Sequence, residues 1–191
     1  MTSAYLRKAA RMMDVGADSC YCSASFTTIK ALADESIPVT SHVGLIPSKA
    51  TWTGGFKAVG KTADQALKVW EHVRRLEDCG ALAAELEVVP DRIAAEITRR
   101  TPLIMLGMGA GPWADAQCLF AEDVLGCTRG HKPRHAKIYR NFRTEMDRLQ
   151  QERIAAFGEF KADVDRGAYP EARHAVPVSD DELAKFLEAI G

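Results

Sequence analysis

Short apolar runs alternate with amphipathic patterns along most of this chain. The strand-like runs cover residues 18–23, 37–45, 81–88 and 102–112, and a weaker one covers 117–120. Between them, apolar residues recur at helical spacing over residues 4–13, 26–35, 62–80 and 91–100. This alternation predicts a parallel α/β sheet, in which polar residues at the carboxyl ends of the strands usually build the active site.

The final third of the chain follows a different pattern. Residues 134–165 predict a long, highly charged helix, and the charges between Arg143 and Arg153 are typical of a solvated helical face. Gly167 and Pro170 interrupt the pattern, and Ser179-Asp-Asp-Glu182 predicts a capping box that starts a terminal helix. We therefore expect C-terminal helices after the sheet.

The number of strands separates two architectures. Five parallel strands would suffice for a doubly wound sheet, whereas a closed barrel of this class needs eight. The pattern along the chain does not choose between them.

Composition excludes several functional classes. The 191 residues contain 25 Lys and Arg against 26 Asp and Glu, so no charge excess points to nucleic acid or an anionic membrane. No apolar run reaches the roughly 18 residues of a transmembrane helix, and the N-terminal pattern lacks the apolar core of a secretory signal. We therefore expect a cytoplasmic protein.

The five cysteines fit reduced thiols better than a disulfide framework. Cys20 and Cys22 would share one face of a strand, and we interpret them as core residues rather than metal ligands. The pair has no ligand partners at a recognisable spacing, and His131, His135 and His174 are scattered without one, so no metal site is recognisable in this chain.

Two glutamates near the end of the third strand could carry chemistry. Glu87 precedes Val-Val-Pro90, and Glu85 lies two residues earlier on the same face. A carboxylate that is partly buried at a strand end is a usable proton acceptor. Either residue could also be a structural or solvated carboxylate, and spacing alone does not choose between them.

His42 occupies the corresponding end of the second strand, just before Gly44. Its imidazole could donate to a substrate oxygen, transfer a proton, or satisfy a hydrogen bond in the core.

Glycines mark two further segments. The turn from Gly107 to Pro112 fails the dinucleotide-binding pattern, because Pro112 occupies the position of its last glycine. We interpret it as a tight turn close to a ligand or a neighbouring strand. The loop after Pro47 contains Gly54, Gly55 and Lys57, and its glycines indicate a shaped or mobile backbone over a ligand.

Several of these segments, taken in order, resemble the ketopantoate hydroxymethyltransferase family. The strings are Ser41-His-Val-Gly-Leu45, Gly54-Gly-Phe-Lys57 with Gly60-Lys61, Leu86-Glu-Val-Val-Pro90, Gly107-Met-Gly-Ala-Gly-Pro112 with Asp115 and Gln117, Asp123-Val-Leu-Gly126, Pro133-Arg134 with Lys137 and Tyr139, and Gly167-Ala-Tyr-Pro170 with His174. Each string is short, whereas the ordered set is specific. The resemblance suggests a family region over residues 1–174 and a helical extension over 175–191.

The resemblance implies a (β/α)8 TIM-type barrel, of which this chain would hold strands 4–8. Family members transfer a hydroxymethyl group from methylenetetrahydrofolate to the enolate of an α-keto acid held on Mg²⁺. Carried over by position, Glu87 is the general base and His42 contacts the keto acid. Gly54, Gly55 and Lys57 would belong to a loop over the substrate or the folate.

The chain also departs from the family pattern. Strands 1–3, with the two aspartates that bind the metal, have no counterpart here. The family's fourth-strand motif, Lys-Leu-Glu-Gly-Gly, aligns with Tyr21-Cys-Ser-Ala-Ser25, so the lysine becomes Tyr21 and the acidic residue becomes Ser23.

Three hypotheses follow from the resemblance and these departures. In the first, the chain is an enzyme subunit, a homo-oligomer or a partner of a second chain that supplies strands 1–3, and acts on an α-keto acid. In the second, it is a non-catalytic scaffold or regulatory homologue that has lost the metal site. In the third, it is part of a longer enzyme.

Overall fold

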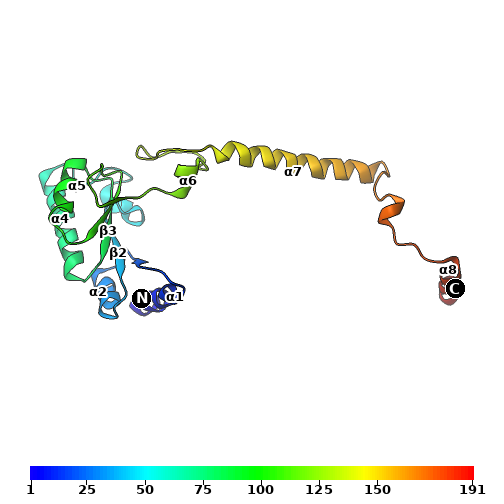
Figure 1. Ribbon diagram of the computed structural model, residues 1–191, viewed down its shortest axis with the longest axis horizontal. Helices are drawn as coiled ribbons and strands as arrows, with labels where there is room; N and C mark the ends of the chain where they lie inside the picture. Colours follow the sequence, from blue (N-terminus) through cyan, green and yellow to red (C-terminus); the bar gives the residue numbers. More distant parts are fainter. The chain divides into compact units, whose positions relative to one another are not determined.

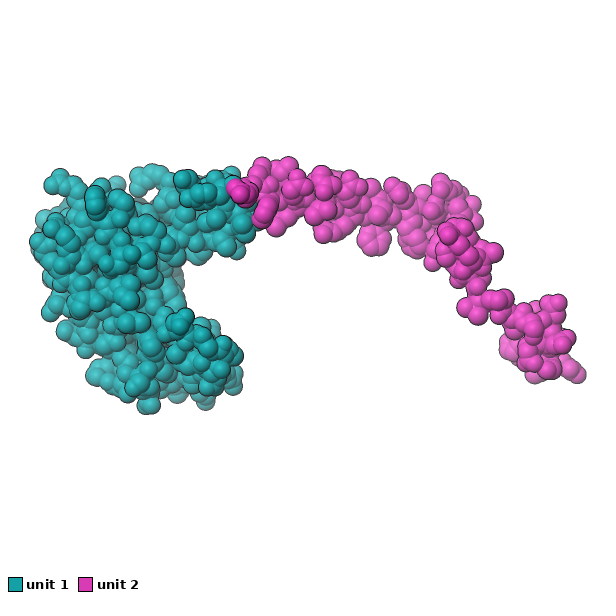
Figure 2. Space-filling model, in the orientation of Figure 1, with its two compact units in different colours: residues 1–139 teal, residues 140–191 magenta.

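The computed structural model describes all 191 residues, from Met1 to Gly191. The chain forms two compact units, Met1–Tyr139 and Arg140–Gly191, which Figure 2 distinguishes by colour.

The first unit is built on five parallel strands, as the sequence predicted. They are β1 (Cys20–Tyr21), β2 (Val39–Gly44), β3 (Ala83–Glu87), β4 (Ile104–Met108) and β5 (Ala116–Gln117). The strands are hydrogen-bonded in the order β1-β2-β3-β4-β5, and every neighbouring pair is parallel. A doubly wound sheet reverses its strand order at a switch point, whereas barrel strands follow one another around the sheet. The observed order is therefore consistent with a TIM-type fold.

Helices connect most of the strands in this unit, and one helix lies before the first strand and another after the last. They are α1 (Thr2–Asp14), α2 (Phe26–Asp34), α4 (Ala63–Asp78), α5 (Asp91–Thr98) and the short α6 (Ala121–Leu125). Figure 1 shows α4 and α5 next to each other on one side of the strands. None of the helices combines the length and the apolar composition that a membrane span requires.

Local side-chain caps explain where two of these helices begin. The side chain of Ser25 accepts a hydrogen bond from the backbone N–H of Thr28 at the start of α2. The Thr62 side chain does the same for Gln65 at the start of α4, as the sequence predicted. Such caps satisfy backbone donors that have no partner within the helix, and each stabilises its helix by about 1 kcal/mol.

The loop after Pro47 contains more structure than the sequence predicted. It holds a 3₁₀ turn, η1 (Pro47–Lys49), and the single-turn helix α3 (Ala50–Thr53). Gly54 ends α3 in the left-handed conformation, with a φ of 73°. The hydroxyl of Thr53 donates to the carbonyl of Ala50 and closes the turn.

The core lies between the strands and the helices that cover them. Its fully buried members include Ile29 and Leu32 from α2, Val73 and Leu76 from α4, and Leu86 from β3. The hydrophobic faces predicted for α2 and α4 therefore pack on the sheet.

Cys20 and Cys22 belong to this core, which confirms their interpretation as packing residues. All five cysteines are free thiols.

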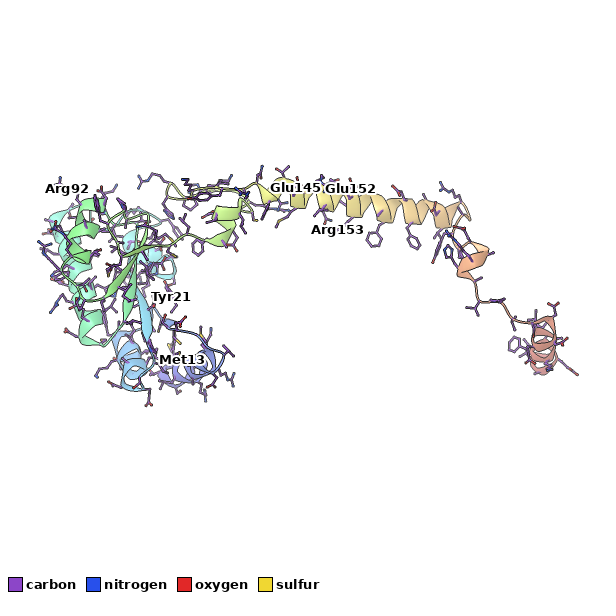
Figure 3. All side chains as sticks on the ribbon, viewed as in Figure 1. Met13, Tyr21, Arg92, Glu145, Glu152 and Arg153 are labelled. Carbon is purple, nitrogen blue, oxygen red and sulfur yellow. The ribbon has the colours of Figure 1, made fainter.

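The second unit contains α7 (Phe142–Asp165), η2 (Ala172–His174) and α8 (Asp180–Ile190). The Ser179 side chain caps α8 by accepting from the N–H of Glu182, which confirms the predicted start of the terminal helix. The side chains labelled on α7 in Figure 3, Glu145, Glu152 and Arg153, project outward, and all three residues are exposed. The charges of α7 are therefore exposed as predicted, but apolar residues of the same helix, such as Phe157, are exposed as well.

The long helix begins at Phe142 and not at Arg134, where the sequence predicted it. Asn141 caps α7 with its side chain, which accepts from the N–H of Thr144. Tyr139, two residues before this cap, lies outside any helix, and its N–H donates to the carbonyl of Val124. That tertiary hydrogen bond holds residues next to the cap in an irregular conformation despite their helical pattern. The family boundary expected near residue 174 stays a prediction.

Candidate active site

The candidate site lies at the carboxyl ends of β2 and β3. In their parallel register, His42 is paired with Glu85 and Gly44 with Glu87. The three ionisable side chains are buried, with exposed fractions of 3% for His42, 9% for Glu85 and 8% for Glu87. The structure thus brings together both glutamates that sequence spacing could not separate and the histidine of the preceding strand.

His42 lies between the two carboxylates. Its Nε2 is 3.0 Å from Oε2 of Glu87, and its Nδ1 is 3.7 Å from Oε2 of Glu85. Nε2 is nevertheless a buried atom without a properly aligned hydrogen bond, so its contact with Glu87 is close but not linear. Contacts of catalytic groups are often poorly aligned until substrate binds, and this one leaves Nε2 available for a ligand atom.

Tyr21 of β1, which is labelled in Figure 3, completes the cluster. Its hydroxyl forms a hydrogen bond with Nδ1 of His42. Burial raises the pKa of Tyr21 well above its usual range, and the negative charge of Glu85 and a hydrogen bond with that carboxylate raise it further. Tyr21 therefore stays protonated and acts as a neutral hydrogen-bonding group that links His42 and Glu85.

Gly44 allows the two strand ends to approach closely. It has a φ of 84°, and a β-carbon at this position would lie 2.3 Å from the carbonyl oxygen of Glu87. The N–H of Leu45 donates to the same carbonyl. Only glycine fits here, because any side chain would push the backbone that carries Glu87 away from β2.

The residue after Glu87 is strained. Val88 has a φ of 50°, in the left-handed region that β-branched residues rarely adopt. Its N–H donates to the carbonyl of Met108, and its carbonyl accepts from Val59, so both of its backbone groups are fixed. Strain of this kind costs roughly 1–3 kcal/mol and concentrates at functional sites.

A cavity of about 450 Å³ opens beside the cluster. Its walls come from the ends of β1 to β4 and from two following loops: Tyr21, Ser23, His42, Ile46, Pro47, Ser48, Glu85, Glu87, Met108, Cys118 and Phe120. Most of the wall is apolar apart from the cluster itself. Such a site can hold a small substrate against two carboxylates, an imidazole and a phenol.

Cys118 adds a thiol to the cavity wall. Burial raises the pKa of Cys118, and the charges of Glu85 and Glu87 add to the effect. Sequence analysis did not identify this residue, because it follows the short strand β5 without any motif of its own.

The predicted loop residues lie in different places. Lys57 lines a second cavity, of about 410 Å³, which Glu87 also lines. Gly54 and Gly55 line neither of these two cavities. A β-carbon on Gly54 would lie 2.9 Å from Nζ of Lys57, so this glycine makes room for the lysine side chain.

The residues of this chain that could hold a metal ion are His42, Glu85 and Glu87. One potential ligand atom from each lies within 4.8 Å of the others. The spacing along the chain concealed this set, since its members come from two strands. Mg²⁺ prefers an octahedron of oxygen atoms, whereas an imidazole between two carboxylates suits Mn²⁺, Fe²⁺ or Zn²⁺ better. The donor set therefore does not fit Mg²⁺, and we assign no step of the chemistry to a metal held by these residues.

Comparison with known proteins identifies the family. The family described as Ketopantoate hydroxymethyltransferase matches residues 2–172. This chain belongs to the ketopantoate hydroxymethyltransferase family. The resemblance noted from the ordered motifs is thereby confirmed.

Individual relatives agree. The chain is 34% identical over 159 residues to a 3-methyl-2-oxobutanoate hydroxymethyltransferase of Syntrophomonas wolfei. The aligned region covers 83% of this chain and 55% of that protein. It is 36% identical over 158 residues to the enzyme of the same name from Clostridium botulinum, again covering 83% and 55%. A third, from Methylibium petroleiphilum, is 33% identical over 162 residues, covering 85% and 53%.

The chain thus spans about half the length of the curated relatives it matches. The activity, substrates and partners of a complete ketopantoate hydroxymethyltransferase therefore remain proposals for this chain.

Proposed function

We propose that this chain contributes the proton-abstracting half of a hydroxymethyltransferase site, or of a related aldol-type site, that acts on an α-keto acid. The observation that supports this function best is the buried contact between His42 and Glu87, 3.0 Å apart at the wall of a substrate-sized cavity. The names of the relatives suggest 3-methyl-2-oxobutanoate as the first substrate to test.

Glu87 is the proposed general base. Its carboxylate removes the proton from the carbon next to the ketone, and the electrons of that C–H bond form the carbon–carbon double bond of the enolate. The enolate carbon then bonds to the methylene carbon of the one-carbon donor, which family resemblance suggests is methylenetetrahydrofolate. Both carbon–nitrogen bonds of that methylene break, and water supplies the hydroxyl oxygen of the product. The nitrogens of the released tetrahydrofolate take up the proton held by Glu87 and one proton from the water. A carboxylate at the wall of the cavity suits the first step, because a general base must lie within reach of the proton that it removes.

His42 is the proposed substrate contact. Its unaligned Nε2 can donate a hydrogen bond to a substrate oxygen on which negative charge develops. Tyr21 holds the opposite edge of the ring at Nδ1 and so fixes its orientation. Glu85 lies on that same edge, where it can position the imidazole but is farther from the ring than Glu87.

The loop that contains Gly54, Gly55 and Lys57 is proposed to lie over the bound substrates. Lys57 supports this role, since it shares a cavity with Glu87. The left-handed conformations of Gly54 and Gly55 allow the tight turn that brings the lysine to that cavity.

We also propose that further strands complete the barrel around this site. They would come from a second copy of the chain or from another chain that supplies barrel strands 1–3. In the observed order, β1 and β5 each have a neighbour on one side only, so both could accept an added strand. The oxygen ligands that Mg²⁺ would need are then expected on the added strands rather than on His42, Glu85 and Glu87.

Deuterium exchange tests the proposed chemistry directly. The purified chain, alone and with a candidate partner chain, is incubated with 3-methyl-2-oxobutanoate in D₂O with added Mg²⁺, and loss of the C3 proton is followed by NMR. We expect exchange that Glu87→Gln reduces at least about 100-fold, the usual scale for loss of a general base. Glu71→Gln, at an exposed position of α4, is the matched control and should leave exchange unchanged. Absence of exchange in every sample would refute the proposal.

One observation favours a second function. The hydroxyl of Tyr21 already engages His42 at the position where the family resemblance places a substrate-binding lysine. A scaffold or regulatory homologue without activity would be consistent with this replacement. It predicts a stable oligomer that binds neither Mg²⁺ nor keto acid, and calorimetric detection of either ligand would contradict it.

A further inference from the structure

The wall of the cavity beside His42 carries two carboxylates and no lysine or arginine. Glu85 and Glu87 are both buried, and His42 is the only basic residue in this wall. Two negative charges with little access to water are unfavourable unless a positive charge lies next to them. The cavity therefore favours a cation between these side chains.

The hydrogen bonds of Tyr21 determine which nitrogen of His42 is free. A carboxylate can only accept, so the Tyr21 hydroxyl donates its single hydrogen to Glu85. The same hydroxyl must then accept from Nδ1 of His42, which carries the proton of the neutral ring. Nε2 is therefore the nitrogen with a free lone pair, as a metal ligand requires.

That nitrogen lies close to a second acceptor. Nε2 of His42 is 3.0 Å from Oε2 of Glu87, and it has no hydrogen-bond partner although the residue is only 3% exposed. A lone pair and a carboxylate oxygen repel each other at this distance unless a proton or a metal ion lies near both. A proton on Nε2 gives the donor that the proposed reaction uses, whereas a metal ion would take both atoms as ligands.

A single ion can reach all three residues of the cluster. One potential ligand atom from each of His42, Glu85 and Glu87 lies within 4.8 Å of the other two. Donor atoms around one ion, with bonds of about 2.0–2.1 Å, are roughly 3–4 Å apart. Small side-chain movements would therefore bring these atoms to bonding distance, and the adjoining cavity leaves a further position for water.

Contacts within the chain hold the ligands in place before any ion binds. The parallel register pairs His42 with Glu85, and the N–H of Leu45 donates to the backbone carbonyl of Glu87. The hydroxyl of Tyr21 holds the ring at Nδ1. A hydrogen bond to the second nitrogen of a histidine ligand orients the ring and strengthens metal binding. The cluster is therefore preorganised for an ion at Nε2.

The kind of donor atoms selects the ion. Mg²⁺ prefers oxygen ligands alone, whereas Zn²⁺ binds imidazole nitrogen together with carboxylate oxygens. We propose that His42, Glu85 and Glu87 bind one Zn²⁺ ion, at a site separate from the Mg²⁺ ligands expected on the added strands. The ion would occupy the Glu87 oxygen and the Nε2 atom that the proposed reaction uses, so its binding blocks proton abstraction. Only this inhibition rests on the function proposed above; the metal site does not.

Metal titration of the full 191-residue chain tests the site without any turnover. The chain is freed of metal with a chelator, and Zn²⁺ and Mg²⁺ are then titrated separately by calorimetry. We expect one Zn²⁺ per chain, bound at least about 100-fold more tightly than Mg²⁺. Co²⁺ serves as a spectroscopic probe: it should give visible absorption bands that disappear when one equivalent of Zn²⁺ is added.

Nearly isosteric variants locate the site. Glu85→Gln and Glu87→Gln should each weaken Zn²⁺ binding at least about tenfold, and the double variant about 100-fold or more. Tyr21→Phe, which removes the hydroxyl at Nδ1, should weaken it about tenfold. His131→Ala and Glu71→Gln, at exposed positions, are the matched controls and should have no effect. Circular dichroism confirms that each variant is folded.

Three results would overturn the proposal. The first is Zn²⁺ that binds no more tightly than Mg²⁺. The second is binding that the folded double variant retains, since exposed histidines would then hold an adventitious ion only. The third comes from urea denaturation of the unaltered chain: an ion held by β2 and β3 together must raise the free energy of unfolding, so saturating Zn²⁺ without stabilisation contradicts the site.

Deuterium exchange separates the metal site from the proposed chemistry. Zn²⁺ added to a sample that exchanges the C3 proton should stop the exchange in proportion to the fraction of chains that hold the ion. If no sample exchanges, the proposed chemistry fails, while the titration and the variants still decide whether the metal site exists.

Discussion

Nε2 of His42 lies 3.0 Å from a carboxylate oxygen of Glu87 on the adjacent strand, and Glu85 faces the opposite edge of the same ring. One imidazole thus separates two buried carboxylates. In the absence of substrate, the contacts of His42 stabilise the two carboxylates and hold the proposed base, Glu87, in place.

Removal of the imidazole should destabilise the fold. His42→Ala leaves Glu85 and Glu87 buried without their shared partner, and we expect a loss of about 3 kcal/mol in the free energy of unfolding. Urea denaturation measures it. Adding Glu85→Gln to His42→Ala should recover part of the loss, because one of the two facing charges is removed. His131→Ala, at an exposed histidine, is the control and should change stability by less than about 0.5 kcal/mol. If His42→Ala lowers the free energy of unfolding no more than the control does, the cluster makes no net contribution to stability.

The close approach at Gly44 gives a second prediction. Gly44→Ala should lower the free energy of unfolding by about 3 kcal/mol or more. The added β-carbon would lie 2.3 Å from the backbone carbonyl oxygen of Glu87, and the positive φ of this residue is unfavourable for alanine. Gly16→Ala is a matched control, since Gly16 has a φ of 88° but nothing within 4 Å of the added carbon. Its cost should be about 1 kcal/mol. Thermal unfolding measures both variants. An equal loss of stability in Gly44→Ala and Gly16→Ala would mean that the ends of β2 and β3 can move apart to accommodate the added β-carbon.

His72 of α4 should make the fold sensitive to mild acid. Burial, together with the positive charges of Lys49 and Arg75, lowers the pKa of His72 to about 4. The unfolded chain therefore binds a proton at this residue below a pH of about 6.5, while the folded chain does not. The contribution of His72 to the free energy of unfolding is therefore fully present above a pH of about 6.5 and is lost as the pH falls toward 4. We expect a loss of about 2–3 kcal/mol, the size that the lowered pKa implies.

Denaturation at a series of pH values measures this effect. The variant His72→Gln should flatten the stability curve between pH 6.5 and pH 4 relative to the unaltered chain. An unchanged slope would assign the acid sensitivity to other groups.

Cys118 reports on the charge of the cluster. Because burial and the carboxylates Glu85 and Glu87 raise the pKa of its thiol, Cys118 should react slowly with iodoacetamide at pH 8. Glu85→Gln removes one of these charges and should speed the reaction about two- to threefold.

Peptide mass spectrometry follows each cysteine separately. Cys79 is the internal control, because burial and the neighbouring Arg75, Asp78 and Lys30 determine its shift without Glu85. A similar acceleration at both thiols would indicate general loosening of the fold rather than a local electrostatic effect.

Much of the secondary structure followed from the sequence. Apolar spacing predicted α1, α2, α4 and α5, since each must cover its hydrophobic face on the sheet. The capping residues Thr62 and Ser179 marked helix starts because their side chains satisfy backbone groups only a few residues away. The pattern was misleading between Arg134 and Asn141, where a tertiary hydrogen bond from Tyr139 to Val124 outweighs local helix propensity.

The sequence by itself determined the family, the parallel α/β class and the candidates Glu87 and His42, because these depend on ordered motifs and on residues at strand ends. Tertiary structure decided the rest. Only the register of β2 against β3 brought Glu85 into contact with His42, and only the pairing of β1 with β2 brought the hydroxyl of Tyr21 to the same ring. The physical reason is that local patterns specify which face of an element is buried. Which side chains of different elements meet depends on strand order, register and the close approaches that glycines such as Gly44 allow.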